Sequence, residues 1–138
     1  MVGEFVGSNS GIGYVLQRSI GTFDLPTMFA ALVILGGRAP EYLRNDPSVL
    51  SLVREFAAQN KCIGAIGHGI QVLTAASLTR GRTVTCHENV QVEVERDGGK
   101  YVDKPAVRDG KLVTAQTWES HPEFYRELFT CLGEASLA

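Results

Sequence analysis

Apolar positions in the first half of the chain alternate between short continuous runs and helical spacing. Residues 32–35 form a β-branched-rich apolar run before two glycines, which predicts a strand buried on both faces. An aspartate–proline pair then marks a helix start, and apolar side chains recur at helical spacing over residues 47–59. The run at 62–66 predicts a second buried strand, and the spacing over 70–76 predicts a second helix.

Strand and turn signals dominate the second half of the chain. Residues 82–86 predict a third strand. Valines alternate with other residues over 89–95, which predicts a half-exposed strand. Asp109 and Gly110 lie between two short apolar pairs and predict a two-residue hairpin.

A last helix is expected near the C-terminus. Ser120 and Glu123 form a capping box at its start, and Gly133 is expected to end it. Its aromatic side chains are expected to pack in the core rather than to line a ligand site: Phe124, Tyr125 and Phe129. The order strand–helix–strand–helix–strand predicts an α/β fold with a parallel sheet covered by helices.

Length and composition narrow the function classes. A chain of 138 residues with 44% hydrophobic and 20% charged residues suits one globular domain with a single core. The net charge of −2, without a basic run, argues against nucleic-acid binding. The longest apolar run, 28–35, is too short to span a membrane. Three widely spaced cysteines and no secretory signal favour a reducing compartment, the cytoplasm, without a disulfide framework.

The most informative stretch is the strand at 62–66 and the glycine-rich turn after it. A buried strand that runs into a tight turn and a helix is the geometry of a nucleophile elbow, which normally presents Cys or Ser at its apex. Gly67 occupies the apex here and has no side chain. An ordinary strand–helix turn that needs small residues explains the same pattern, and both readings stay open at this point.

Four motifs in order resemble the ThiJ/PfpI family, at 36–41, 65–69, 81–82 and 109–114. That family includes a Parkinsonism-associated deglycase, intracellular proteases and glyoxalases. The resemblance runs from residue 32 to the C-terminus. It implies a flavodoxin-like three-layer sandwich of the class I glutamine amidotransferase-like superfamily, with a mainly parallel sheet that lacks the family's first strand–helix–strand unit. It also implies self-association, as a dimer or a hexamer.

The resemblance places the family's catalytic positions on this chain. The nucleophilic Cys aligns with Gly67, and the base that follows it aligns with His68. Glu41 aligns with a Glu that reaches the His from a neighbouring subunit, and the oxyanion hole is expected to use the amides of Gly37 and His68. His87 takes the place of a Tyr that often lines the pocket, and Arg38 is expected beside it.

Plainer explanations exist for these residues. His68 is also explained as a turn residue that binds backbone, and Glu41 as a solvated carboxylate at a helix start. Cys86 and His87 are adjacent and point to opposite faces of a strand, so a dyad is not expected there. Three His and three Cys without paired spacing predict no metal site, and no cofactor is expected.

Residues 1–31 carry a second resemblance, to the C-terminal tail of a nitrate/sulfonate-type ABC-transporter permease. This resemblance divides the chain into a segment 1–31, either disordered or packed at the sheet edge, and a ThiJ/PfpI-like domain 32–138.

We expect a domain on a cysteine hydrolase, glyoxalase or protease scaffold that is catalytically impaired by Gly67. Its substrate, if active, is a small carbonyl compound or a peptide. The alternatives are a non-catalytic module for small-ligand binding or oligomerisation, and a truncated chimeric product with an exposed edge strand.

Overall fold

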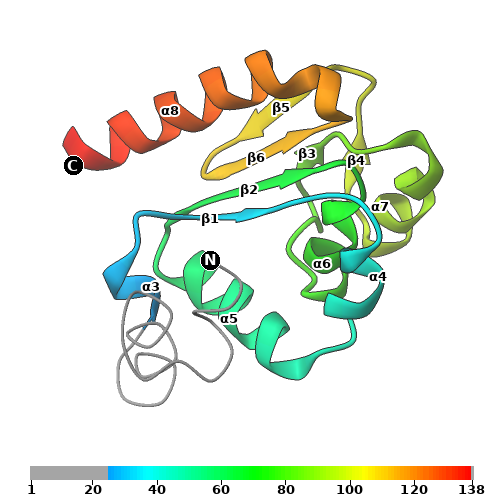
Figure 1. Ribbon diagram of the computed structural model, residues 1–138, viewed down its shortest axis with the longest axis horizontal. Helices are drawn as coiled ribbons and strands as arrows, with labels where there is room; N and C mark the ends of the chain where they lie inside the picture. Colours follow the sequence, from blue (N-terminus) through cyan, green and yellow to red (C-terminus); the bar gives the residue numbers. More distant parts are fainter. Residues whose placement is uncertain (1–24, 138) are drawn as a thin grey trace.

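A four-stranded sheet organises residues 25–137, the part of the chain that the computed structural model describes (Figure 1). Its strands lie in the order β1 (Ala31–Ile34), β2 (Cys62–Ile66), β6 (Leu112–Ala115) and β5 (Ala106–Asp109). The first three are parallel, and β5 pairs with β6 in the antiparallel direction. The fold class is therefore the expected α/β fold with a mainly parallel sheet.

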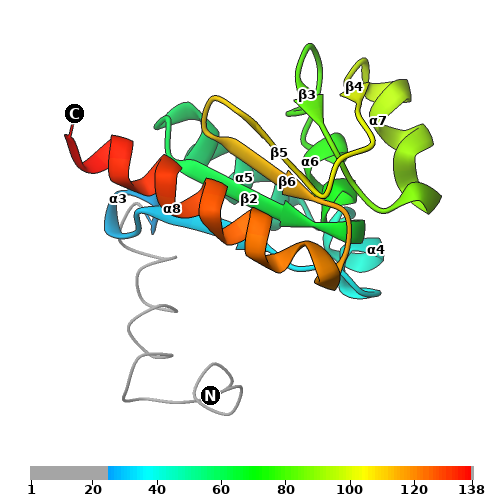
Figure 2. The ribbon, with the colours of Figure 1, turned by 90° about the horizontal axis from the view of Figure 1, so that it is seen from above.

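Helices cover both faces of this sheet and complete three layers (Figures 1 and 2). On one face lie α5 (Pro47–Ala58) and α6 (Ile70–Ala75), whose apolar residues share a core with β1 and β2. On the other face, α8 (His121–Leu137) packs against β2, β5 and β6. Two short helices, α3 (Leu25–Met28) and α4 (Ala39–Leu43), flank β1 in sequence.

The central elements form where the sequence predicts them. Asp46 caps α5 by accepting hydrogen bonds from the backbone amides of Ser48 and Val49, at 2.8 and 3.4 Å. Every residue of β2 is buried, as its continuous apolar run predicts. The hairpin is confirmed, and the two residues between its paired strands are Gly110 and Lys111.

The prediction of a strand over 89–95 is wrong, because most of this segment belongs to helix α7 (Gln91–Asp97). Valines at every second position also fit a helix if only every other valine is buried, because the buried ones are then four residues apart. Val90 and Val94 share the buried face, four residues apart, whereas Val92 is 46% exposed. Gly98, in the left-handed conformation, ends the helix.

The strand expected over 82–86 is shorter than predicted and belongs to another sheet. β3 (Thr83–Val84) pairs in parallel with β4 (Lys100–Tyr101), and these two strands form a separate ribbon. In the main sheet, β6 is the parallel partner of β2 on the side away from β1.

The C-terminal helix differs from expectation at both ends. The capping box joins Thr117 and Ser120 around the short 3-10 turn η3 (Trp118–Ser120), one turn earlier than the predicted box at Ser120. The helix continues through Gly133 to Leu137. Of its aromatic residues, Phe124 alone is buried, as predicted. Tyr125 and Phe129 are exposed, and their rings stack with centroids 6.1 Å apart.

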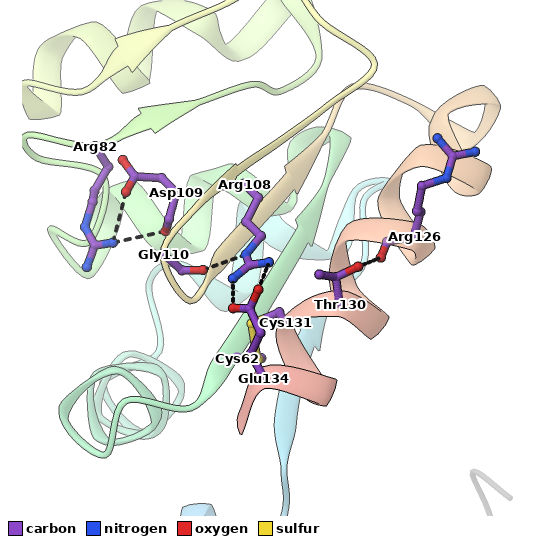
Figure 3. The surroundings of a disulfide bond; sticks show 9 residues. All are labelled: Cys62, Arg82, Arg108, Asp109, Gly110, Arg126, Thr130, Cys131 and Glu134. Atoms are coloured by element: carbon purple, nitrogen blue, oxygen red, sulfur yellow. Dashed lines mark hydrogen bonds and ion pairs between the residues drawn. A yellow bond between two sulfur atoms is a disulfide. The ribbon is translucent and has the colours of Figure 1, made fainter. Parts of the chain in front are cut away.

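The cysteines depart from expectation as well, because Cys62 and Cys131 form a disulfide between β2 and α8 (Figure 3). They are 69 residues apart in sequence, and only the packing of α8 on β2 brings them together. Beside the disulfide, Arg108 of β5 forms an ion pair with Glu134 of α8 (Figure 3). The hydrogen bonds from Arg108 lower the pKa of the Glu134 carboxyl group.

Strand β1 is more exposed than predicted. The prediction that it is buried on both faces is wrong, because Val33 is 38% exposed and Leu35, directly after the strand, is also exposed. Among the described residues, only β2 pairs with β1, so its other edge has no described strand beside it.

The proposed division at residue 31 falls at this strand, since Ala31 is its first residue. Helix α3, within the segment 1–31, contacts α5. The remainder of that segment, residues 1–24, lies outside the described part, and the division stays a prediction. Within residues 25–137, no helix has the length and apolar character needed to cross a membrane.

Candidate functional site

The turn after β2 has the backbone of an elbow. Gly67 has a φ of +59°, in the left-handed region that favours glycine, and opens the 3-10 turn η1 (Gly67–Gly69) that leads into α6. A Cβ atom built at Gly67 lies 3.4 Å from the backbone oxygen of Gln116 and meets nothing closer. The site therefore has room for a side chain, although its backbone conformation is costly for one.

Two neighbouring glycines are needed for space. A Cβ atom at Gly36 would lie 2.9 Å from the backbone oxygen of Ile66. At Gly69 it would lie 2.6 Å from the backbone oxygen of Ile34. The end of β1 and the elbow are thus packed backbone against backbone, which fixes the position of Gly67.

An open pocket of about 500 Å³ lies over this elbow. Its lining segments follow directly after β1, β2 and β6, so the pocket is at the carboxyl edge of the parallel sheet, where α/β folds place their ligands. The lining residues are Leu35, Gly36, Gly37, Ile66, Gly67, His68, His87, Gln116, Thr117, Trp118 and His121.

Most of the predicted site residues meet in this pocket. Gly67, His68, Gly37 and His87 line it, although they come from three separate segments of the chain. The rings of His68 and His87 are 4.8 Å apart between centroids. The Nδ1 atom of His87 accepts a hydrogen bond from the backbone amide of Asn89 at 3.2 Å.

The other two predicted residues lie elsewhere. Arg38 and Glu41, at the N-terminal end of α4, are exposed and are not among the residues that line the pocket. Arg38 is therefore not brought to the position that the resemblance gave it. The action of Glu41 from a neighbouring subunit concerns an assembly of chains and stays a prediction.

Sequence reasoning missed the segment after β6 as part of the site. Gln116, Thr117 and Trp118 line the pocket, and Trp118 is 74% exposed. The side-chain amide of Gln116 donates to the Asp103 carboxylate at 2.8 Å and to the Tyr101 hydroxyl at 3.2 Å. The available signal was the strand 112–115 itself, because a residue that follows a parallel strand beside β2 must lie near the elbow.

All three histidines of the chain line the pocket. His121, the first residue of α8, joins His68 and His87 there, and its ring packs edge-on against Tyr125. Within the described residues, no group of three or more His, Cys, Asp or Glu side chains is placed to hold a metal ion.

A polar network behind the pocket connects α4, α6 and α7. Arg44 binds both carboxylate oxygens of Glu93, at 3.0 and 3.1 Å, and the amide of Gln71 donates to the same carboxylate at 2.9 Å.

Cys86 is buried. Its burial and, to a lesser extent, the negative charge of Glu93 raise the pKa of its thiol to about 12. Cys86 is therefore a neutral thiol and not a nucleophile.

Comparisons with known proteins agree with this fold. The profile of the DJ-1/PfpI family matches residues 3–130. Protein DJ-1 homolog D of Arabidopsis thaliana is 41% identical over 124 residues, which cover 81% of this chain and 32% of that protein. Protein/nucleic acid deglycase 2 of Escherichia coli is 37% identical and aligns with 78% of this chain and 63% of its own length.

Solved structures show the same likeness. A two-domain protein of Anabaena variabilis with DJ-1/ThiJ/PfpI-like and ferritin-like domains superposes with a TM-score of 0.77 at 32% identity, over 79% of this chain and 31% of that one. DJ-1 of Schizosaccharomyces pombe has a TM-score of 0.68 at 29% identity, over 75% and 55%. The chain spans less than two thirds of the length of each of these proteins.

Proposed function

Because this chain belongs to the DJ-1/PfpI family, we propose that it is a small-molecule-binding domain of that family in which thiol catalysis is impaired by Gly67. The observation that carries the proposal is the backbone of Gly67. It has the positive φ of an elbow, faces a pocket that His68 and Gly37 also line, and has space for a Cβ atom.

The missing step can be stated chemically. In a thiol-bearing relative, the thiolate attacks the carbonyl carbon of the substrate, a carbon–sulfur bond forms, and the carbonyl electron pair moves to oxygen. The proton of the thiol passes to a base, and we assign this role to His68. The backbone amides of Gly37 and His68 are the proposed donors to the resulting oxyanion. Without a thiol, the first bond cannot form, and loss of a nucleophile typically lowers the rate by several orders of magnitude.

The test compares this chain with Gly67→Cys, using methylglyoxal and a peptide as substrates. We expect no turnover by the unmodified chain and measurable turnover by the Cys variant. Gly67→Ala is the matched control, since it brings the same backbone cost without a thiol, and it should stay inactive. Turnover by the unmodified chain that His68→Ala abolishes would contradict the proposal.

We further propose that the chain self-associates, as a dimer or a hexamer. The support is the family resemblance and the exposed position of Glu41 on α4, where a neighbouring subunit can reach it. Sedimentation of the chain and of Glu41→Gln tests this. A monomer at all concentrations would argue against it.

A further inference from the structure

We propose that the pocket over Gly67 binds a monocarboxylate with an apolar, preferably aromatic, tail, and that the histidines receive its carboxylate. The inference rests on the proposed function and names the ligand class of that pocket. It is carried by the charges of the lining residues, by the arrangement of the imidazoles and by the exposed apolar side chains of the lining.

Histidine is the one charged or titratable residue type among the described residues that line the pocket. Among its described lining residues there is no Asp, Glu, Lys or Arg, so His68, His87 and His121 alone can give it charge. Imidazole is the side chain that takes up a proton between pH 5 and 8. None of these lining residues carries a negative charge, and each imidazole has an N–H that can donate to an anion, so the lining favours an anionic ligand over a cationic one.

The paired rings favour an anion with one charge. The rings of His68 and His87 are 4.8 Å apart between centroids, and because the Nδ1 atom of His87 accepts the amide hydrogen of Asn89, its Nε2 atom carries the N–H that can donate. A carboxylate beside the two rings can accept an N–H hydrogen bond from each of them. A phosphate group with two charges is normally held by Arg or Lys, and the lining residues include neither.

Besides the histidines, the pocket is lined by apolar side chains, by glycines and by the polar residues Gln116 and Thr117, and it is open to solvent. Of its apolar lining side chains, Ile66 is buried, whereas Leu35 and Trp118 are 65% and 74% exposed. Exposed large apolar side chains beside a pocket commonly mark the surface that a ligand covers. A pocket of about 500 Å³ accommodates a ligand with a single ring.

Charged groups also occur on the elements that surround the pocket. They are Arg38 and Glu41 of α4, Glu88 beside His87, Asp103 before β5, Glu119 of η3, and Glu123 of α8. Glu93 of α7 is paired with Arg44. Carboxylates and guanidinium groups ordinarily keep their charge between pH 5.5 and 8, so the imidazoles supply the change in charge over this range.

The experiment uses the fluorescence of Trp118, the single tryptophan of the chain, which lines the pocket itself. Phenylacetate is titrated at pH 6 and pH 8, beside its neutral isostere phenylacetamide and acetate, which lacks the ring. We expect saturable binding of phenylacetate at pH 6, with at least tenfold weaker binding of both analogues and a severalfold loss of affinity at pH 8.

Variants then locate the carboxylate. His68→Gln should weaken phenylacetate binding at least fivefold and flatten its pH dependence. Lys61→Gln removes a positive charge before β2, at the opposite end of that strand from Gly67, and should leave the affinity unchanged within twofold. The comparison of acid with amide needs no variant, so it decides the question even if His68→Gln fails to fold.

Equal binding of the acid and the amide, an affinity that rises with pH, or no saturable change in Trp118 emission would overturn this inference. These outcomes are separable from the failure of the proposed function. If Gly67→Cys gains turnover while phenylacetate does not bind, the proposed function stands and the ligand class is wrong. If phenylacetate binds while Gly67→Cys stays inactive, the reverse holds.

Discussion

Strands β1 and β2 are neighbours that look alike in sequence and differ in their surroundings. Both are short apolar runs that end at glycines, and they pair in parallel. β2 lies between β1 and β6, with helices over both of its faces, and every residue in it is buried. β1 pairs with a described strand on one side only, and Val33 is partly exposed. Burial of an apolar run is therefore decided by its neighbours and not by its own composition.

Helix α8 covers one face of β2. Its Phe124 lies directly over β2, because a Cβ atom built on Gly64 would be only 2.7 Å from the Phe124 ring. Glycine in the middle of β2 thus creates the space that the ring fills. Phe129, one turn further along the same helix, is 66% exposed.

The largest expected effect is the loss of the ring over β2. Phe124→Ala should lower the free energy of unfolding by about 3–5 kcal/mol, since it removes a fully buried aromatic side chain and leaves a cavity. Phe129→Ala, on the exposed face, should change it by less than about 0.5 kcal/mol. Urea denaturation measures both. Similar losses of unfolding free energy for the two variants would contradict the difference between the buried Phe124 and the exposed Phe129.

The disulfide between β2 and α8 should contribute nearly as much. Closing a loop of this sequence separation, 69 residues, stabilises by up to about 4 kcal/mol in the chain-entropy treatment. We therefore expect a reductant to lower the Tm of the unmodified chain and to leave that of Cys131→Ala unchanged. Cys86→Ala is the control that keeps the disulfide and should retain the response to reductant.

Added volume should also distinguish the two strands. Gly64→Ala forces the Phe124 ring to move and should cost about 1–3 kcal/mol, because the centre of the sheet is close-packed. Removing volume from β1 with Val33→Ala should cost less than about 1 kcal/mol, since that side chain is partly exposed already. The two variants can be compared by thermal unfolding. A larger loss for Val33→Ala would indicate that β1 is covered in solution.

The smallest effect concerns the buried thiol of Cys86 and depends on pH. Burial raises its pKa to about 12 in the folded chain, from an ordinary value of 9.0. The unfolded chain therefore releases this proton at lower pH than the folded chain. The stabilisation is complete below pH 9 and is lost as the pH rises from there toward 12, by about 1 kcal/mol at pH 10. Chemical denaturation at pH 8 and pH 10 measures this loss, and Cys86→Ala should lack it. An equal pH response in the variant would contradict the buried neutral thiol.

Local signals in the sequence were enough for the elements that depend on local physics. The capping side chain of Asp46 and the turn at Gly110 act within a few residues, and both are where the sequence places them. The tight turn after β2 is also recognisable, because Gly67 and Gly69 directly follow a buried apolar run.

Features that depend on long-range packing could not be predicted in this way. The spacing of the valines in α7 fits a strand and a helix equally. Only the structure, in which Val94 is buried and Val92 is exposed, distinguishes the helix from the strand. The disulfide required the packing of α8 on β2, and the role of Trp118 required the position of β6 beside β2. The continuation of α8 through Gly133 shows, in the same way, that tertiary packing overrides a weak helix-ending residue.

The three histidines of the pocket follow β2, precede α7 and begin α8, so no continuous fragment of the chain shorter than 68–121 contains them all. Any ligand that binds there must therefore favour the whole folded domain over the unfolded chain by mass action. At a free concentration one hundred times its Kd, such a ligand adds about 2.7 kcal/mol to the free energy of unfolding. A thermal-shift screen can thus search for the natural ligand without an assay of turnover.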